Sequence, residues 1–404
     1  MKRPKAPAHP GFLLLFLLYA PLAGIGGVDG MFGVAWPTMR QGFGVPIDAI
    51  GLAMAFGTTG YLLCSFFVGR LLARFAVHHL LAFSCTLVGL SFLGNCLVPS
   101  WTWFAALGLT VGFGAGGIDA GLNTYVALRL GEREMHWLHA CYGLGATLGP
   151  WFMTAILNAF GDWRPAYWIM GPLQLAIAGA YVLTGPKWKK FDRGGGKGSQ
   201  GREPARRKLT GHRTPMGETL RHGPSWAGML LFFLYSGAEV GLGLWSYTIL
   251  TESRGVATTL AGILMGGFFG FFTVGRILSG FFIKKISTRR LLLGSLFLAL
   301  AGAILLWANL GPLPSFVSII LTGFVIAPVF PCLVSSTQAR VGARHAGNTI
   351  GMQMAAAGTG AAALPSLMGV LARRVSLEAI PVVIVALFAL ILGLFFLATR
   401  KEEK

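Results

Sequence analysis

Long apolar runs, separated by short polar segments, make up most of the chain. A helix of about 20 residues crosses the roughly 30 Å hydrocarbon layer of a membrane, and twelve runs approach that length. These runs lie near residues 12–37, 48–72, 79–98, 102–128, 137–159, 165–184, 225–250, 259–283, 290–309, 314–339, 347–371 and 378–398. The pattern predicts an all-α polytopic membrane protein with twelve transmembrane helices.

The first apolar run follows a basic start, as the apolar part of a signal peptide does. It continues past Gly24 to Pro37, however, which is longer than a signal peptide requires. We therefore interpret it as a retained transmembrane span.

Lys and Arg gather in the segments that follow the even-numbered spans. These residues are Arg70, Arg74, Arg129, Arg133, Lys284, Lys285, Arg289, Arg290, Arg340 and Arg344, and both ends of the chain are basic as well. The other connecting segments hold little positive charge beyond Arg40, Arg164, Arg254, Arg373 and Arg374. Because positively charged loops favour the cytoplasmic side, we expect a cell-membrane protein with both termini in the cytoplasm.

One long segment, residues 185–223, is not apolar. It is rich in Gly, Lys and Arg and has few large apolar residues, so it cannot bury enough surface to fold alone. A lipid-surface or nucleic-acid role is an alternative for so basic a stretch. We predict a flexible cytoplasmic linker between an N-terminal half, residues 1–184, and a C-terminal half, residues 224–404.

The two halves contain related residues in the same order. Matching pairs include Gly112-Phe113 with Gly323-Phe324, Arg129 with Arg340, Asp29 with Glu239, and Gly33 with Gly243. Six spans in each half make both copies cross the membrane in the same sense. Such a parallel repeat places the substrate site near the membrane midplane, between two halves that rock around it.

Composition and charge exclude other classes of protein. The chain is 54% hydrophobic and 12% charged, whereas soluble domains carry about 25% charged residues, so a soluble enzyme is excluded. The formal net charge of +19 lies in short loops rather than on one face, so no nucleic-acid partner is expected. The five cysteines lie within apolar runs without metal-ligand spacing. We expect no metal or cofactor, and a monomer in the lipid bilayer.

Three acids lie inside apolar spans: Asp29, Asp119 and Glu239. A carboxylate at the centre of a membrane helix costs about 2.5–3.5 kcal/mol, so it must face the bundle interior or water. A carboxyl group in such a place is suited to taking up and releasing protons, and we assign these three residues to proton coupling. The alternative is a structural carboxyl group that is hydrogen-bonded to a neighbouring helix.

Asn123 follows Asp119 by four residues, so the two side chains share one helix face. Together they offer an acceptor and an amide, which suits a hydroxyl-rich solute; a hydrogen bond between helices is the alternative for Asn123. Further candidates for contact with the solute are Trp36, His139, Tyr142, Trp245 and Gln353. Tryptophans also mark membrane interfaces, and His139 is alternatively a proton relay or a packed neutral side chain.

Arg276 lies well inside an apolar span. Its side chain either snorkels to the cytoplasmic boundary or pairs with one of the buried acids. We assign it to gating or structural charge.

The loop between the second and third spans resembles a signature of the major facilitator superfamily. The loop reads Gly69-Arg-Leu-Leu-Ala-Arg74-Phe-Ala-Val-His78-His79, and a related copy runs from Gly280 through Lys285. The resemblance implies two six-helix halves related by a parallel pseudo-two-fold repeat. It also implies that Arg74 and Lys285 belong to a cytoplasmic gate. Ala73 replaces the signature's acid, so this gate lacks its usual charge relay.

The buried acids resemble the pattern of the fucose:proton symporter group within that superfamily. Members of that group carry an acid in the first span and an acid-x-x-x-Asn pair in the fourth, as Asp29, Asp119 and Asn123 do here. Tyr142 stands where the group has an Asn. The resemblance implies a secondary transporter that imports a small polar solute, a sugar, with protons by alternating access. The alternatives are a proton-coupled exporter of drugs or metabolites, and a transporter-like scaffold or receptor.

Overall fold

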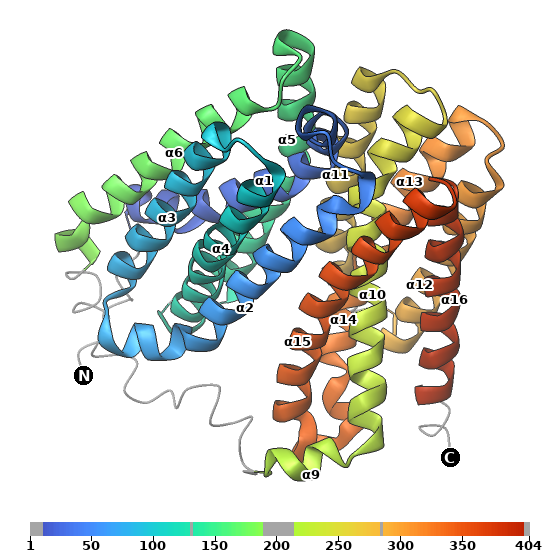
Figure 1. Cartoon of the computed structure of the whole chain (residues 1–404). Coiled ribbons are helices and arrows are strands. Elements are labelled where there is room, and N and C mark those ends of the chain that lie inside the picture. The colour runs from blue at the N-terminus through green and yellow to red at the C-terminus, as the bar shows by residue number, and fades with distance from the viewer. Residues whose placement is uncertain (1–10, 130–131, 189–213, 283–285, 400–404) are drawn as a thin grey trace.

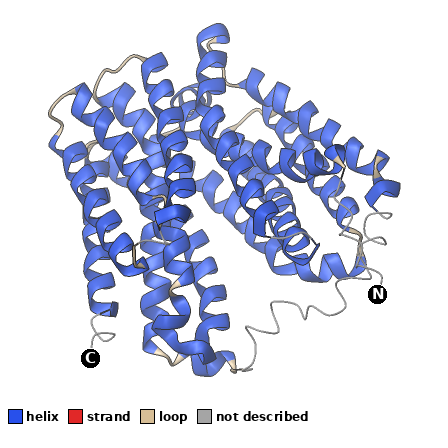
Figure 2. Ribbon diagram, turned by 180° about the vertical axis from the view of Figure 1, so that it is seen from behind, coloured by secondary structure: helices blue, strands red, loops and turns tan. Residues whose placement is uncertain are grey.

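A computed structural model describes residues 11–129, 132–188, 214–282 and 286–399. Helices make up nearly all of these residues, and none of the described residues forms a strand (Figure 2). Twelve of the described helical stretches are long and apolar enough to cross a membrane. The prediction of an all-α protein with twelve membrane spans is confirmed.

The N-terminal half contains six long helices and one short helical turn. They are α1 Phe12–Phe43, η1 Ile47–Ala49, α2 Ile50–Arg74, α3 Val77–Leu97, α4 Trp101–Arg129, α5 Glu132–Phe160 and α6 Arg164–Leu183. Close packing within this half depends on glycine. A Cβ atom on Gly145 would lie 1.9 Å from the carbonyl oxygen of Ala23, so α5 lies against α1 at a distance that larger residues do not allow.

The C-terminal half has the same plan with two additional breaks. Its elements are α9 Met216–Leu220, α10 Gly223–Thr248, η2 Ile249–Ser253, α11 Thr258–Phe282, α12 Thr288–Ala308, α13 Pro312–Ile326, α14 Val329–Ser335, α15 Thr337–Arg374 and α16 Ala379–Thr399. The tenth span therefore consists of two helices, α13 and α14, interrupted next to Pro328. Near its start α15 is kinked at Gly342, which has a left-handed φ of 76°.

The two halves meet at one end of the molecule and diverge toward the other (Figure 1). They diverge toward the end that carries α9 (Figure 1). Where they meet, α5 packs on α11: the Asn158 amide donates to Thr259 Oγ1 at 2.9 Å, and Trp151 Nε1 donates to the Ile263 carbonyl at 3.1 Å. On the other side of the interface, Gly51 of α2 lies against Ser366 of α15.

The predicted linker, residues 185–223, lies partly outside the described residues, since 189–213 are not described. Its two flanks are. Trp188 is 1% exposed and packs on Tyr125 and Tyr181, so the first flank is attached to the N-terminal half. The second flank contains α9, which lies against α15 of the C-terminal half.

Candidate functional site

Asp29 lies in the middle of α1, where it is held from a second helix. The hydroxyl of Tyr142, on α5, donates a hydrogen bond to Asp29 Oδ2 at 2.9 Å. The helices come this close because Gly26 faces the Tyr142 backbone; a Cβ atom at Gly26 would lie 2.2 Å from the Tyr142 carbonyl oxygen. The Asp29 side chain nevertheless remains exposed between the helices.

Asp119, on α4, accepts hydrogen bonds at both carboxylate oxygens. The Asn123 amide donates to Oδ1 at 2.7 Å, and the Tyr61 hydroxyl, on α2, donates to Oδ2. Asn123 also donates to the Asp119 carbonyl at 2.9 Å, so its amide bonds within its own helix. Tyr61 is a site residue that the sequence did not predict.

Glu239, on α10, forms an ion pair with Arg276, on α11. The Arg276 guanidinium lies 3.6 Å from Glu239 Oε1, and its carbon Cζ lies 4.3 Å from the centroid of the Phe272 ring. Of the two interpretations of Arg276, the structure supports pairing with an acid rather than snorkelling to the membrane boundary.

These groups lie near one another across the two halves. Tyr142 of the N-terminal half interacts electrostatically with Asp29 of its own half and with Glu239 and Arg276 of the other. Asp29 and Asp119 also interact electrostatically. The residues Asp29, Tyr61, Asp119, Asn123, Tyr142, Glu239 and Arg276 therefore form one group, which we call the central polar cluster.

Three predicted solute contacts lie outside this cluster, buried by helix packing. Trp36 is fully buried against Trp101, with ring centroids 5.0 Å apart. Trp245 donates from Nε1 to the Pro365 carbonyl at 3.0 Å, and Gln353 Oε1 accepts from Thr337 at 2.9 Å. All three are 0% exposed, so no solute touches them unless the helices separate.

The remaining predicted residues lie at or beyond the edges of this region. His139 is exposed on α5, one turn before Tyr142. Arg74 is exposed at the end of α2. Lys285 lies outside the described residues. Among the residues that are described, no group of three or more His, Cys, Asp or Glu is placed to hold a metal ion.

Two ion pairs join the halves where they meet. Arg40, in the last turn of α1, pairs with Glu252 of η2, and Arg373, in the last turn of α15, pairs with Asp48 of η1 at 3.2 Å. In both pairs the cation lies in the last turn of a long helix of one half, and the acid lies in the short helical element that follows the first long helix of the other half.

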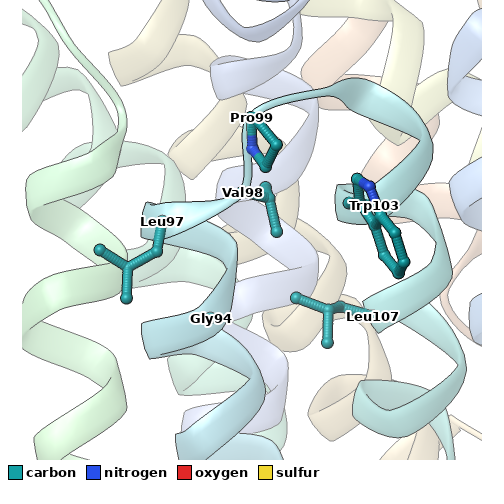
Figure 3. A pocket seen from close by; sticks show the side chains of 6 residues that line it. All are labelled: Gly94, Leu97, Val98, Pro99, Trp103 and Leu107. Carbon is teal, nitrogen blue, oxygen red and sulfur yellow. The ribbon is translucent and has the colours of Figure 1, made fainter.

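A surface groove lies at the turn between α3 and α4. It is lined by Gly94, Leu97, Val98, Pro99, Trp103 and Leu107 (Figure 3). Leu97 and Trp103 are mostly exposed, and the lining contains no ionisable side chain. The groove therefore contributes no chemistry to the candidate site.

Comparison with known proteins identifies the family to which the chain belongs. The family model of the major facilitator superfamily matches residues 22–365 and 246–404. The chain belongs to the major facilitator superfamily. It is therefore a multi-pass membrane transporter and not an enzyme.

The relatives of this superfamily member are distant. A bacterial homolog of the human lysosomal transporter Spinster, in an inward-facing and unoccupied conformation, matches with a TM-score of 0.76 at 15% identity, over 98% of each chain. The nucleoside transporter NupG matches with a TM-score of 0.72 at 13% identity, over 98% of this chain and 100% of its own. Bypass of stop codon protein 6 of Saccharomyces cerevisiae is 25% identical over 394 residues, 90% of this chain and 78% of that protein.

Proposed function

We propose that the chain is a secondary active transporter that moves a small polar solute, a sugar, in symport with protons by alternating access. The observation that carries this proposal is the central polar cluster, to which both halves contribute ionisable groups. Rocking of the halves changes which of these groups face water, which is the requirement for coupling.

The three acids differ in how well their charges are compensated. Glu239 has a guanidinium partner, and Asp119 has two neutral donors, from Tyr61 and Asn123. Asp29 has one donor, the Tyr142 hydroxyl, among the hydrogen bonds of the described residues, and it is the most exposed of the three. A carboxylate with little compensation and access to water exchanges protons most readily. We assign the main coupling role to Asp29.

Asp119 and its partners suit recognition of the solute. A carboxylate, an amide and a phenol hydroxyl lie together on α2 and α4, and all of them form hydrogen bonds with hydroxyl groups. This donor and acceptor set favours a neutral, hydroxyl-rich molecule over an apolar one. Among the candidate solutes, it favours a sugar over an apolar drug.

The orientation and the boundaries belong to the same proposal. The loop charges support a cell-membrane protein with both termini and residues 185–223 in the cytoplasm. Residues 185–223 then link an N-terminal half, 1–184, to a C-terminal half, 224–404. The end at which the halves diverge then faces the cytoplasm (Figure 1). A Ser199→Cys protein in intact cells should resist a membrane-impermeant thiol reagent added outside. Rapid labelling would contradict this orientation and indicate that residues 185–223 face the outside.

The test of function is uptake of labelled sugars into proteoliposomes with an acidic exterior. The unmodified protein should accumulate its sugar, and Asp29→Asn should lose accumulation while keeping exchange of solute, because exchange needs no proton turnover. Asp162→Asn is the matched control, since Asp162 lies in the loop between α5 and α6 beside Arg164. Accumulation that persists in Asp29→Asn would contradict the assignment, and proton-driven dye efflux without sugar uptake would favour the exporter.

A further inference from the structure

A pair of histidines lies where α9 meets α15, away from the central polar cluster. His222 stands directly before α10, and His345 lies near the start of α15. Their imidazole rings stack with centroids 4.3 Å apart and planes 11° apart. Stacked histidines at this distance interact directly, so the charge on one ring affects the other.

Hydrogen bonds attach both rings to the segments around them. His345 Nδ1 lies 3.2 Å from Thr219 Oγ1 of α9, and His222 Nδ1 lies 3.1 Å from Ser225 Oγ. The Asn348 amide adds a bond from α15 to Thr219 Oγ1 at 3.0 Å. The histidine stack is therefore part of the contact that holds α9 on α15.

Both histidines lie at the N-terminal ends of helical stretches. His222 is the residue that caps the N-terminus of α10. The backbone at Gly342 is not helical, so the helical stretch that carries His345 begins after it, and His345 lies in its first turn. A helix N-terminus carries partial positive charge and repels cations. Burial and the neighbouring His345 lower the pKa of His222 below its ordinary value.

The charged groups near the stack do not offset this repulsion. On the α9 side, the described charged residues are Glu218 and Arg221, and on α15 the nearest one is Arg344. Glu218 pairs with Arg344, so its carboxylate is already engaged. A proton on His222 therefore adds positive charge where cations predominate.

We propose that the His222–His345 stack is a pH-operated clasp, which holds α9 on α15 while His222 is neutral and releases it when His222 is protonated. Docking is complete above about pH 6.5, the ordinary pKa of histidine, and is lost as the pH falls below it, because His222 binds a proton more weakly in the docked state than in the released state. In the proposed orientation the clasp faces the cytoplasm. As a consequence that rests on the proposed symport, it responds to the protons that the transporter itself delivers.

The test uses the full chain in detergent, with a spin label at Gly217→Cys on α9. Gly217 is exposed and a Cβ atom there meets nothing within 4 Å; the chain without this substitution gives the background from its own cysteines. The label should be immobile at about pH 7.5 and should gain a mobile fraction as the pH is lowered to about 5. His345→Gln and His222→Phe should each remove this gain, whereas Glu218→Gln should retain it.

Several outcomes would overturn the clasp. One is a label that stays immobile in the unmodified chain throughout this pH range. Another is a gain of label mobility at low pH in both histidine variants that equals the gain in the chain with both histidines. A third is a label already mobile near neutral pH in both variants, because the rings would then serve as packing without a switch. None of these outcomes depends on sugar or proton transport, so the clasp and the proposed function fail separately.

Discussion

At the scale of single residues, two tyrosine hydroxyls distinguish the carboxylates of the central polar cluster. Tyr142 donates to Asp29 and Tyr61 donates to Asp119. A hydrogen bond to a charged group contributes roughly 1.5–3 kcal/mol. Each hydroxyl therefore matters to the carboxylate that it contacts, and the two tyrosines should have separable effects.

Replacing each tyrosine with phenylalanine tests this separation. Tyr61→Phe should raise the KM for the solute about tenfold, the effect of about 1.4 kcal/mol, and leave the ratio of accumulation to exchange unchanged. Tyr142→Phe should lower that ratio with little effect on KM. Both are measured as initial uptake and counterflow in proteoliposomes. Equal effects on KM would contradict the division of roles.

The sequence predicted part of this site because acids are rare in apolar spans. Asp29, Asp119 and Glu239 are conspicuous for that reason, and the spacing of Asp119 and Asn123 predicts their shared face. Tyr61 was missed because its partner lies on another helix, and no spacing along the chain connects them. Trp36, Trp245 and Gln353 were selected by residue type and by position along their spans, whereas their burial is decided by how the helices pack.

At the scale of elements, Arg254 links four segments at the end of the C-terminal half where the halves meet. It donates to Glu378 between α15 and α16, to Ser315 of α13 and to the Leu306 carbonyl of α12. Its side chain is 5% exposed, so its charge depends on these partners. The hydrogen bond from Arg254 holds the pKa of Glu378 below its ordinary value.

Removing this arginine should destabilise the C-terminal half. Arg254→Met should cost roughly 2 kcal/mol, less than a fully buried ion pair because Glu378 is partly exposed. A carboxyl group with a lowered pKa contributes stability above its unfolded value, near 4.5, and this contribution is lost as the pH falls through the folded value. Melting temperatures of the unmodified protein and Glu378→Gln should therefore differ at neutral pH and converge in acid.

The exposed pair of Asp162 and Arg164 provides the control for this stability measurement. Both side chains are about one third exposed or more, and such pairs contribute about 0–1 kcal/mol. Asp162→Asn should therefore melt close to the unmodified protein. A loss as large as that of Arg254→Met would show that any change of charge destabilises this protein.

The helices themselves were predicted better than their ends. All twelve spans were found, yet α1 continues past Pro37 to Phe43, because a membrane helix tolerates proline when its neighbours satisfy the freed backbone groups. The break beside Pro328 and the kink at Gly342 were not predicted. Both depend on local backbone geometry, which the apolar pattern does not encode.

At the scale of the whole molecule, the two halves are joined by two partly exposed ion pairs at the end where they meet. Arg40 with Glu252 and Asp48 with Arg373 each connect one half to the other. Exposed pairs contribute about 0.2–1 kcal/mol each. Two of them bias the halves toward contact at this end without preventing their separation.

Reversing one charge should therefore open this end measurably. Ser366→Cys is a nearly isosteric reporter on α15, since Ser366 faces Gly51 across the interface. Its rate of maleimide labelling in detergent should rise about two- to fivefold with Arg373→Asp, as expected for the loss of about 0.4–1 kcal/mol. High salt should raise the labelling rate of the Ser366→Cys protein in which Arg373 and Asp48 are unchanged. Adding Asp48→Arg should restore the slow rate, and an unchanged rate in Arg373→Asp would contradict the role of the pair.

In the proposed mechanism, the central polar cluster also makes the transporter sensitive to voltage. Three carboxylates and one guanidinium leave an excess of two negative charges when all are ionised. One elementary charge that crosses the full membrane potential gains or loses about 2.3 kcal/mol per 100 mV. An interior-negative potential therefore drives the empty, deprotonated cluster toward the outside. Proton uptake by the cluster removes part of that bias, so the electrical gradient would act mainly on the return of the empty carrier.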